Sequence, residues 1–108
     1  MATTYKVLGQ VNPGATTATT LYTVPGSTSA LCSTLVAANL GVTTKIRVAV
    51  RPAGATLDPK HYIAYDVPVN QYDTLFLTLG ISLATTDVVT VYAGTANVAF
   101  SLFGSELS

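Results

Sequence analysis

The chain has 108 residues, and its composition restricts both its size class and its chemistry. Only 9% of the residues are Asp, Glu, Lys or Arg, against about 25% in typical globular proteins, whereas 49% are hydrophobic. Five basic residues balance five acidic ones, which argues against a nucleic-acid partner, because such a partner needs clustered positive charge. The length fits one domain with one core, and the scarcity of charge predicts surfaces that sister molecules cover.

Residues 1–19 differ in composition from the rest of the chain, being rich in Thr and Ala with a single plausible strand. Two interpretations are open: an arm or edge element that adds a strand to the sheet of another subunit, or a first strand followed by a long loop. Met1 is followed by Ala, Thr and Thr, with neither the basic start nor the apolar stretch of a secretory leader. No segment approaches the ~20 apolar residues of a membrane span. We therefore expect synthesis in the cytoplasm and no membrane partner.

Apolar alternation with a period of two dominates the chain, and this is typical of half-buried strands. In Lys45–Arg51, for example, Ile46, Val48 and Val50 face one way, while the three basic residues and Ala49 face the other. That alternation indicates the solvated face of a strand and not a phosphate site. In chain order, the pattern predicts strands at Tyr5–Val11, Thr20–Val24, Ala30–Ala38, Lys45–Arg51, His61–Val67, Thr74–Leu79, Asp87–Ala93 and Asn97–Phe103, with one short turn in Ser82–Thr86.

Turn sequences rich in Pro, Gly and Asn separate these strands at near-regular spacing. About eight short strands of this kind predict an all-β, single-domain antiparallel β-sandwich, with a jelly roll as its expected form. We expect the sandwich to span residues 20–108, after the arm or edge strand at 1–19. Phe76 and Tyr92 are predicted on outward faces, where a large apolar side chain needs cover that a neighbouring subunit could supply.

Residues that could carry catalysis are sparse. His61 is the only histidine, and Asp66 lies five residues further along the same predicted strand, about 16 Å away at ~3.3 Å per residue and on the opposite face. A general base needs an orienting partner within hydrogen-bond distance, so His61 is interpreted as a strand-surface or interface residue. Cys32 has no basic neighbour in sequence that would favour a thiolate, and a buried, inert role is expected for it. We therefore expect no enzymatic activity.

Cofactor and metal sites are not expected either. One His, one Cys and scattered carboxylates lack the spacing that Zn²⁺ or Ca²⁺ ligation needs, and the glycines form no phosphate-binding motif. Three carboxylates lie at turns or strand starts, where they can accept hydrogen bonds from local backbone N–H groups: Asp58, Asp73 and Asp87.

The six tyrosines are the remaining candidates for a binding role: Tyr5, Tyr22, Tyr62, Tyr65, Tyr72 and Tyr92. Tyrosine is favoured at protein interfaces because it buries a large area while its hydroxyl keeps a polar partner. The rings could also stack against sugars, but the chain has no Trp, and interface packing is the preferred interpretation. The candidate interface anchors are Tyr5, Tyr22, Tyr62 and Phe76.

Four segments resemble small structural proteins of tailed bacteriophages: Thr20–Pro25 (TLYTVP), Ile46–Gly54 (IRVAVRPAG), Lys60–Asp66 (KHYIAYD) and Leu77–Glu106. The resemblance covers most of the chain after Thr19, and none of its motifs is tied to a reaction. It implies a β-rich component of the virion, often arranged around three-fold or higher symmetry.

The function expected from this resemblance is a capsid decoration (cement) subunit that forms homotrimers and clamps neighbouring major capsid proteins. One alternative is a tail, neck or baseplate component that anchors fibres. The other is a receptor- or carbohydrate-binding module.

Overall fold

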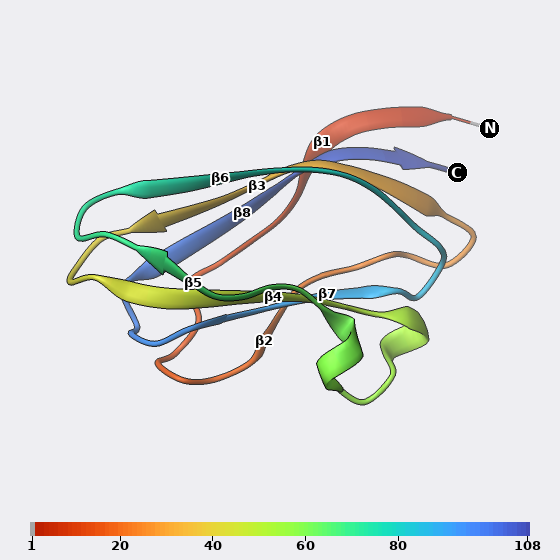
Figure 1. Ribbon diagram of the computed structural model, residues 1–108. Coiled ribbons are helices and arrows are strands. Elements are labelled where there is room, and N and C mark those ends of the chain that lie inside the picture. Colours follow the sequence, from red (N-terminus) through yellow and green to blue (C-terminus); the bar gives the residue numbers. More distant parts are fainter. Residues whose placement is uncertain (1) are drawn as a thin grey trace.

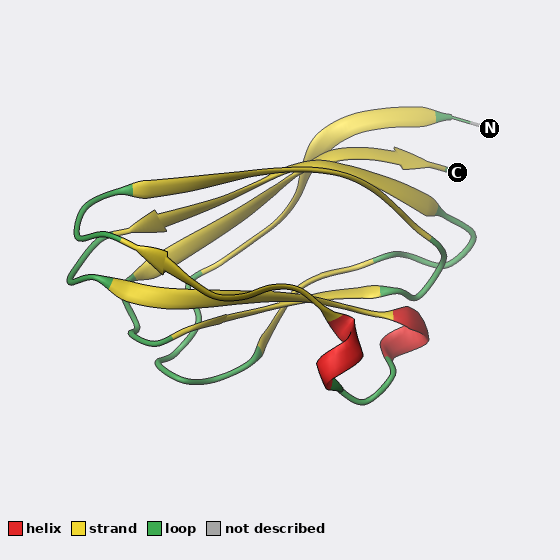
Figure 2. Ribbon diagram, viewed as in Figure 1, coloured by secondary structure: helices red, strands yellow, loops and turns green. Residues whose placement is uncertain are grey.

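The computed structural model describes residues 2–108, which form two four-stranded antiparallel sheets packed face to face (Figures 1 and 2). The strands are β1 (Thr3–Val11), β2 (Thr19–Thr23), β3 (Ser29–Asn39), β4 (Thr44–Arg51), β5 (Tyr62–Val69), β6 (Thr74–Leu83), β7 (Val88–Ala93) and β8 (Val98–Leu107). Two 3₁₀ turns, η1 (Pro52–Gly54) and η2 (Pro59–His61), are the only helical segments in this part of the chain. The all-β antiparallel sandwich predicted from the sequence is confirmed.

The first sheet has the strand order β1-β8-β3-β6, and the second sheet has the order β2-β7-β4-β5. Only β4 and β5 are consecutive strands of one sheet; every other connection carries the chain from one sheet to the other. The pairing of β1 with β8 brings the two ends of the chain side by side (Figure 1). There the N–H of Ala2 donates to the Ser108 carbonyl, and the N–H of Ser108 donates to the Ala2 carbonyl.

The core lies between the sheets and is built from the inward residue of each alternating pair. Leu35 and Leu102 of the first sheet, and Ile46, Val48 and Val91 of the second, have no exposed surface. Full burial of such a side chain contributes roughly 1.5–3 kcal/mol, so this apolar layer holds the two sheets together.

The sequence located all eight strands but misjudged some of their ends. Strand β6 continues through Gly80 to Leu83, where a short turn was expected from Ser82 onward. Gly80 has a φ of +62°, a conformation that glycine adopts without a clash because it has no Cβ. The strand therefore bends at Gly80 without ending, and the turn is confined to Thr85 and Thr86.

Candidate interaction surface

The outward side of the first sheet is a broad surface without charge. The four strands of this sheet contain only two charged residues, Lys6 and Glu106, and both are directed to the inward side. Glu106 accepts a hydrogen bond from Tyr22 of the second sheet, and Lys6 pairs with Glu106. We term the outward surface of β1, β8, β3 and β6 the uncharged face. The polar side chains of this face are all uncharged: Thr3, Gln10, Ser29, Thr34, Thr74, Thr78, Ser82, Ser101 and Ser105.

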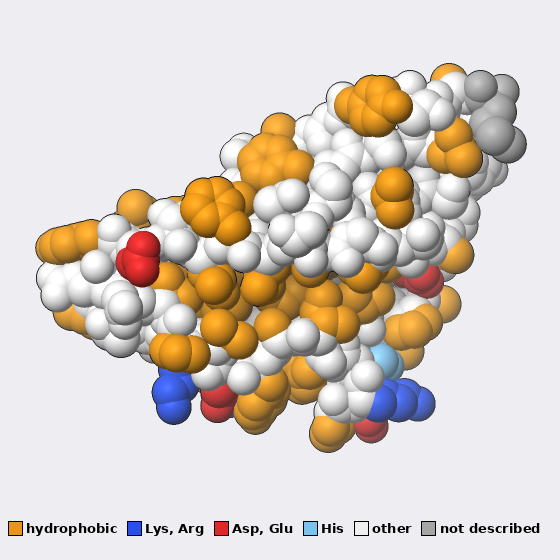
Figure 3. Space-filling view, turned by 45° about the horizontal axis from the view of Figure 1, so that its top comes forward, with side chains coloured by type: hydrophobic (Ala, Val, Ile, Leu, Met, Phe, Trp, Pro, Cys, Tyr) orange, Lys and Arg blue, Asp and Glu red, His pale blue; other side chains and the backbone are white. Residues whose placement is uncertain are grey.

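Large apolar side chains project from the uncharged face. Tyr5 is 84% exposed, Phe76 68%, Leu31 48%, Val7 45% and Phe103 36%. Figure 3 shows hydrophobic side chains standing among uncharged polar ones on the upper layer, with the charged side chains at its margins or below it. These exposed apolar side chains on one uncharged side make the face a candidate interaction surface. Because no ion has to be dehydrated when the face is covered, its burial avoids the largest desolvation cost.

A shallow hollow of about 260 Å³ lies on this side of the molecule, close to the chain ends. Thr3, Leu31, Ser82 and Leu107 contribute to its lining. Its walls are formed by hydroxyl and apolar side chains.

The outward side of the second sheet has a different character, centred on Arg47. The Arg47 guanidinium carbon lies 4.3 Å from the ring centroid of Tyr65 and 4.3 Å from that of Tyr92. Its Nε donates to Asp66 Oδ1 at 2.6 Å, and this hydrogen bond lowers the pKa of the Asp66 carboxyl. Tyr92, which was expected to need cover from another subunit, is half-buried beneath Arg47 of its own chain.

An open groove of about 510 Å³ lies beside this stack and is lined by Leu57, Asp58, Pro59, Tyr62 and Tyr65. The Tyr62 and Tyr65 rings meet edge to face, with centroids 4.9 Å apart. A mostly apolar groove with aromatic walls and a few polar groups can bind a small ligand.

The structure separates the four candidate anchors. Tyr5 and Phe76 lie on the uncharged face, on the edge strands β1 and β6. Tyr62 lies on the other side of the molecule, in the groove. Tyr22 is only 7% exposed, which corrects its assignment as an anchor. A bulge between Thr20 and Tyr22 breaks the alternation of β2, and the ring turns into the core.

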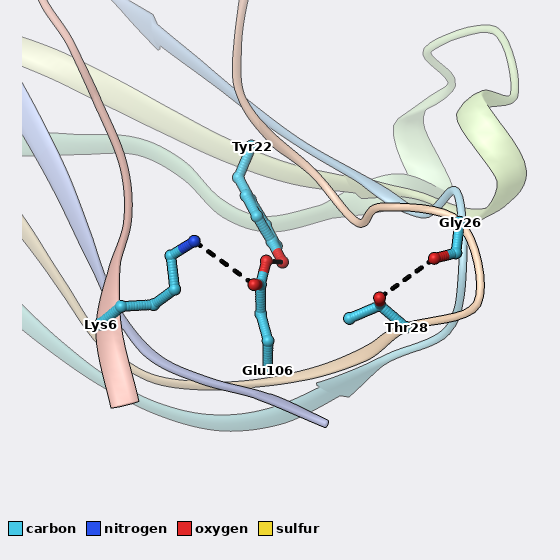
Figure 4. Close-up of polar contacts among 5 residues, drawn as sticks. All are labelled: Lys6, Tyr22, Gly26, Thr28 and Glu106. Atoms are coloured by element: carbon cyan, nitrogen blue, oxygen red, sulfur yellow. Dashed lines mark hydrogen bonds and ion pairs between the residues drawn. The ribbon is translucent and has the colours of Figure 1, made fainter. Parts of the chain in front are cut away.

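Tyr22 instead joins the two sheets through Glu106 and Lys6 (Figure 4). Its hydroxyl donates to Glu106 Oε2 at 2.5 Å, and Lys6 Nζ lies 3.3 Å from Glu106 Oε1. Burial, reinforced by the hydrogen bond to Glu106, raises the pKa of the Tyr22 hydroxyl. The hydrogen bond from Tyr22, with help from Lys6, lowers the pKa of Glu106. The cluster therefore links β2 to β1 and β8.

His61 is a buried residue of η2, so the strand-surface position expected for it is wrong, and the alternative of an interface position stays a prediction. It is 7% exposed, and its Nδ1 accepts the backbone N–H of Asp58 at 3.1 Å. The Asp58 carboxylate in turn accepts the N–H of Lys60 at 3.2 Å. The predicted turn roles of the carboxylates are confirmed for Asp58, and also for Asp73 and Asp87, which accept backbone N–H groups nearby.

Cys32 is fully buried, as expected, and burial raises the pKa of its thiol to about 11. A thiol held in its protonated form is a poor nucleophile. Within residues 2–108, no group of three or more His, Cys, Asp or Glu side chains is placed to hold a metal ion. No helix in the same part of the chain is long and apolar enough to cross a membrane.

Comparisons with protein-family models, with curated proteins and with solved structures find no match.

Proposed function

We propose that the chain is a non-enzymatic structural protein of a tailed-bacteriophage virion, acting as a capsid decoration subunit that binds neighbouring major capsid proteins. The observation that carries this proposal is the uncharged face. A decoration subunit needs contact area and no reacting group. A specific interface buries about 800 Å² per partner, and the broadest side of this molecule, 44 by 27 Å, is large enough to supply that area.

The strand order supports the finer description of the fold as a jelly roll. In that architecture two Greek keys fold onto each other, and the orders β1-β8-β3-β6 and β2-β7-β4-β5 agree with it. Jelly rolls occur in viral capsid and lectin domains. Because a fold does not by itself define a function, the topology is consistent with a virion role without requiring it.

Under this proposal the outward sides of the two sheets have different roles. The uncharged face docks on the shell, where its hydroxyl groups and apolar side chains meet uncharged surface of the capsid protein. The second sheet carries Lys45, Arg47 and Asp66 on its outward side, and this side stays hydrated.

The test begins with intact particles purified from the host that produces this chain. Quantitative mass spectrometry of these particles should find hundreds of copies per virion. A few to a few dozen copies would instead favour the alternative of a tail, neck or baseplate component. Absence of the chain from the particles would contradict any virion role.

Two variants test the docking face itself. Leu31→Glu and Phe103→Glu each introduce charge on an interior strand of the uncharged face, β3 or β8, and should release the chain from the particle. Lys45→Glu on the second sheet is the matched control and should leave attachment unchanged. Circular dichroism of each variant checks that the fold is intact.

A carbohydrate- or receptor-binding role is the second candidate, favoured by the aromatic groove at Tyr62 and Tyr65. Its test is a glycan array probed with the intact chain and with Tyr62→Ala and Tyr65→Ala. Binding that both substitutions abolish would support this role, and an array without binding would contradict it.

A further inference from the structure

The two sheets end in four edge strands, and these differ in how well they are protected. The edges are β1 and β6 in the first sheet and β2 and β5 in the second. An edge strand presents unpaired N–H and C=O groups that can pair with another chain. Monomeric proteins block such pairing with short strands, Lys, Pro or bulges.

Three of the four edges carry these protective devices. Strand β1 contains Lys6 and a register shift between Val7 and Gly9. Strand β2 has only five residues and a bulge. Strand β5 contains Pro68, and its pairing with β4 is interrupted twice.

Strand β6 lacks most of these devices. It is ten residues long, TLFLTLGISL, with no charged residue and no proline. Its register with β3 is unbroken from Thr74 to Thr78. A register shift between Thr78 and Ile81, around Gly80 at a φ of +62°, interrupts only the far part of the strand. The stretch before Gly80 is therefore an open edge with high β-propensity.

The hydrophobic core is incompletely closed along the same flank. Among residues 2–108, eight hydrophobic residues are only partly buried against the core, and six of them come from β5 and β6: Ala64, Val67, Leu75, Leu77, Leu79 and Ile81. On the interior strands of the first sheet, the corresponding Leu35 and Leu102 are fully buried. Figure 3 shows hydrophobic side chains gathered between the upper and lower layers of the sandwich. The inward leucines of β6 would complete their burial only if another chain packed there.

We propose that β6 pairs antiparallel with β6 of a second copy, so that the first sheet continues from one molecule into the next. The absence of charge on β6 means that self-pairing sets no like charges opposite each other. Inward and outward residues alternate along β6, so a two-fold axis at either Phe76 or Leu77 keeps core-side residues opposite core-side residues. An axis at Leu77 sets Leu75 opposite Leu79, and an axis at Phe76 sets Leu75 opposite Leu77. A closed two-fold dimer is also the commonest form of self-association.

This pairing extends both the core side and the uncharged face of the first sheet from one molecule into the next. Leu75, Leu77 and Leu79 of the two copies form one shared apolar layer. The uncharged faces of the two molecules become a single continuous surface, with Tyr5 and Leu31 still exposed. The dimer does not depend on the proposed virion role, since it would form whether or not a capsid is present.

The first experiment measures the mass of the intact chain by light scattering over micromolar and higher concentrations. The expected mass is twice the 11.2 kDa of one chain. Leu77→Lys places a charge on the core side of the open edge, where a long side chain of a monomer can still reach water. It should weaken dimerisation by at least tenfold. Val11→Lys, at a partly buried position on the opposite edge of the same sheet, is the matched control and should leave the dimer intact.

The second experiment keeps the test decisive if Leu77→Lys fails to fold. Phe76→Cys and Leu77→Cys are made in a chain that also carries Cys32→Ala, and each is oxidised. Equivalent cysteines at a two-fold axis lie within the ~7 Å Cα separation that a disulfide allows, so at least one variant should form a covalent dimer. Thr20→Cys, on the edge of the second sheet, should not.

Three results would overturn the inference. One is a chain that stays monomeric at all concentrations, and another is crosslinking at position 20 equal to that at 76 and 77. The third is a mass of three chains, which is the homotrimer expected from the sequence resemblance. A monomer that still binds particles would overturn the dimer and leave the proposed function standing.

Discussion

Most charged side chains in this protein are used to hold its own fold. Arg47 is stacked between two tyrosines and bonded to Asp66. The carboxylate of Glu106 is bound by Tyr22 and Lys6. Charge in this chain is therefore concentrated where it fixes turns and joins strands, and the uncharged face is left to hydroxyls and apolar groups.

Glu106 should make the stability of the protein fall in acid. Its pKa is lowered in the fold, so its contribution is fully present above the ordinary glutamate pKa of ~4.3 and is lost as the pH falls through the lower folded value. We expect the free energy of unfolding, measured with urea at stepped pH, to decline below about pH 4.5. Glu106→Gln should reduce that decline without removing it, since the pKa of Asp66 is lowered too. An unchanged pH profile in Glu106→Gln would show that ionisation of Glu106 adds no stability to the fold.

Two glycines mark places where strands approach too closely for any side chain. A Cβ at Gly9 would clash with the Leu21 carbonyl oxygen, and a Cβ at Gly104 would clash with the Leu31 carbonyl oxygen. Backbone cannot move aside as a flexible side chain can, so Gly9→Ala and Gly104→Ala should each destabilise the fold by about 1–3 kcal/mol. Gly26→Ala is the control, because its Cβ would meet no atom within 4 Å. The measurement is urea unfolding, and equal stability of all three variants would contradict the close approach.

At the scale of elements, strand β1 contributes to the core as well as to the edge of the first sheet. It pairs with β8 from Thr3 to Val11, and Leu8 is buried. Deleting residues 1–11 should lower the free energy of unfolding by at least the ~2 kcal/mol of one buried leucine, with a further loss from the broken ladder. Thermal unfolding followed by circular dichroism measures the effect. A truncated chain with unchanged unfolding would favour the interpretation of residues 1–19 as an independent arm.

The strands could be predicted from the sequence because the alternation of apolar and polar residues that indicates each strand lies within the strand itself. Lys45–Arg51 and Asp87–Ala93 differ from the observed β4 and β7 by one residue at one end. The sandwich follows from the number of such strands. Which strands pair could not be predicted, since nearly all neighbours in the sheets are distant in the chain.

The candidate site was harder to predict, because bulges and short turns change which way a side chain points. Alternation misplaced Tyr22, which a bulge in β2 turns inward, and His61, which ends a 3₁₀ turn instead of beginning a strand. The contact of Arg47 with Tyr92 requires β4 to lie beside β7, a pairing that local pattern does not encode. Tyr5 and Phe76 could be placed on the surface because their strands alternate regularly near them.

For the whole molecule, the separation of charge between its two sides predicts how it should respond to salt. All charged side chains lie off the uncharged face, so attachment through that face involves no ion pair on the side of this chain. At ~1 M salt the screening length is about 3 Å, which would weaken docking through the Lys45 and Arg47 side of the second sheet. It should leave docking through the uncharged face intact, and sulfate salts should strengthen it by favouring apolar burial.

The measurement is the fraction of chain that pellets with virions at stepped concentrations of sodium chloride and sodium sulfate. We expect full retention in both salts for the native chain, and for Lys45→Glu as well. Progressive release by sodium chloride would show that the charged side docks, and the assignment of the uncharged face would then be wrong. Apolar burial does not depend on charge, so it persists when salt screens the ion pairs. If the native chain is retained in salt and Leu31→Glu is released, attachment depends on apolar contacts of the first sheet.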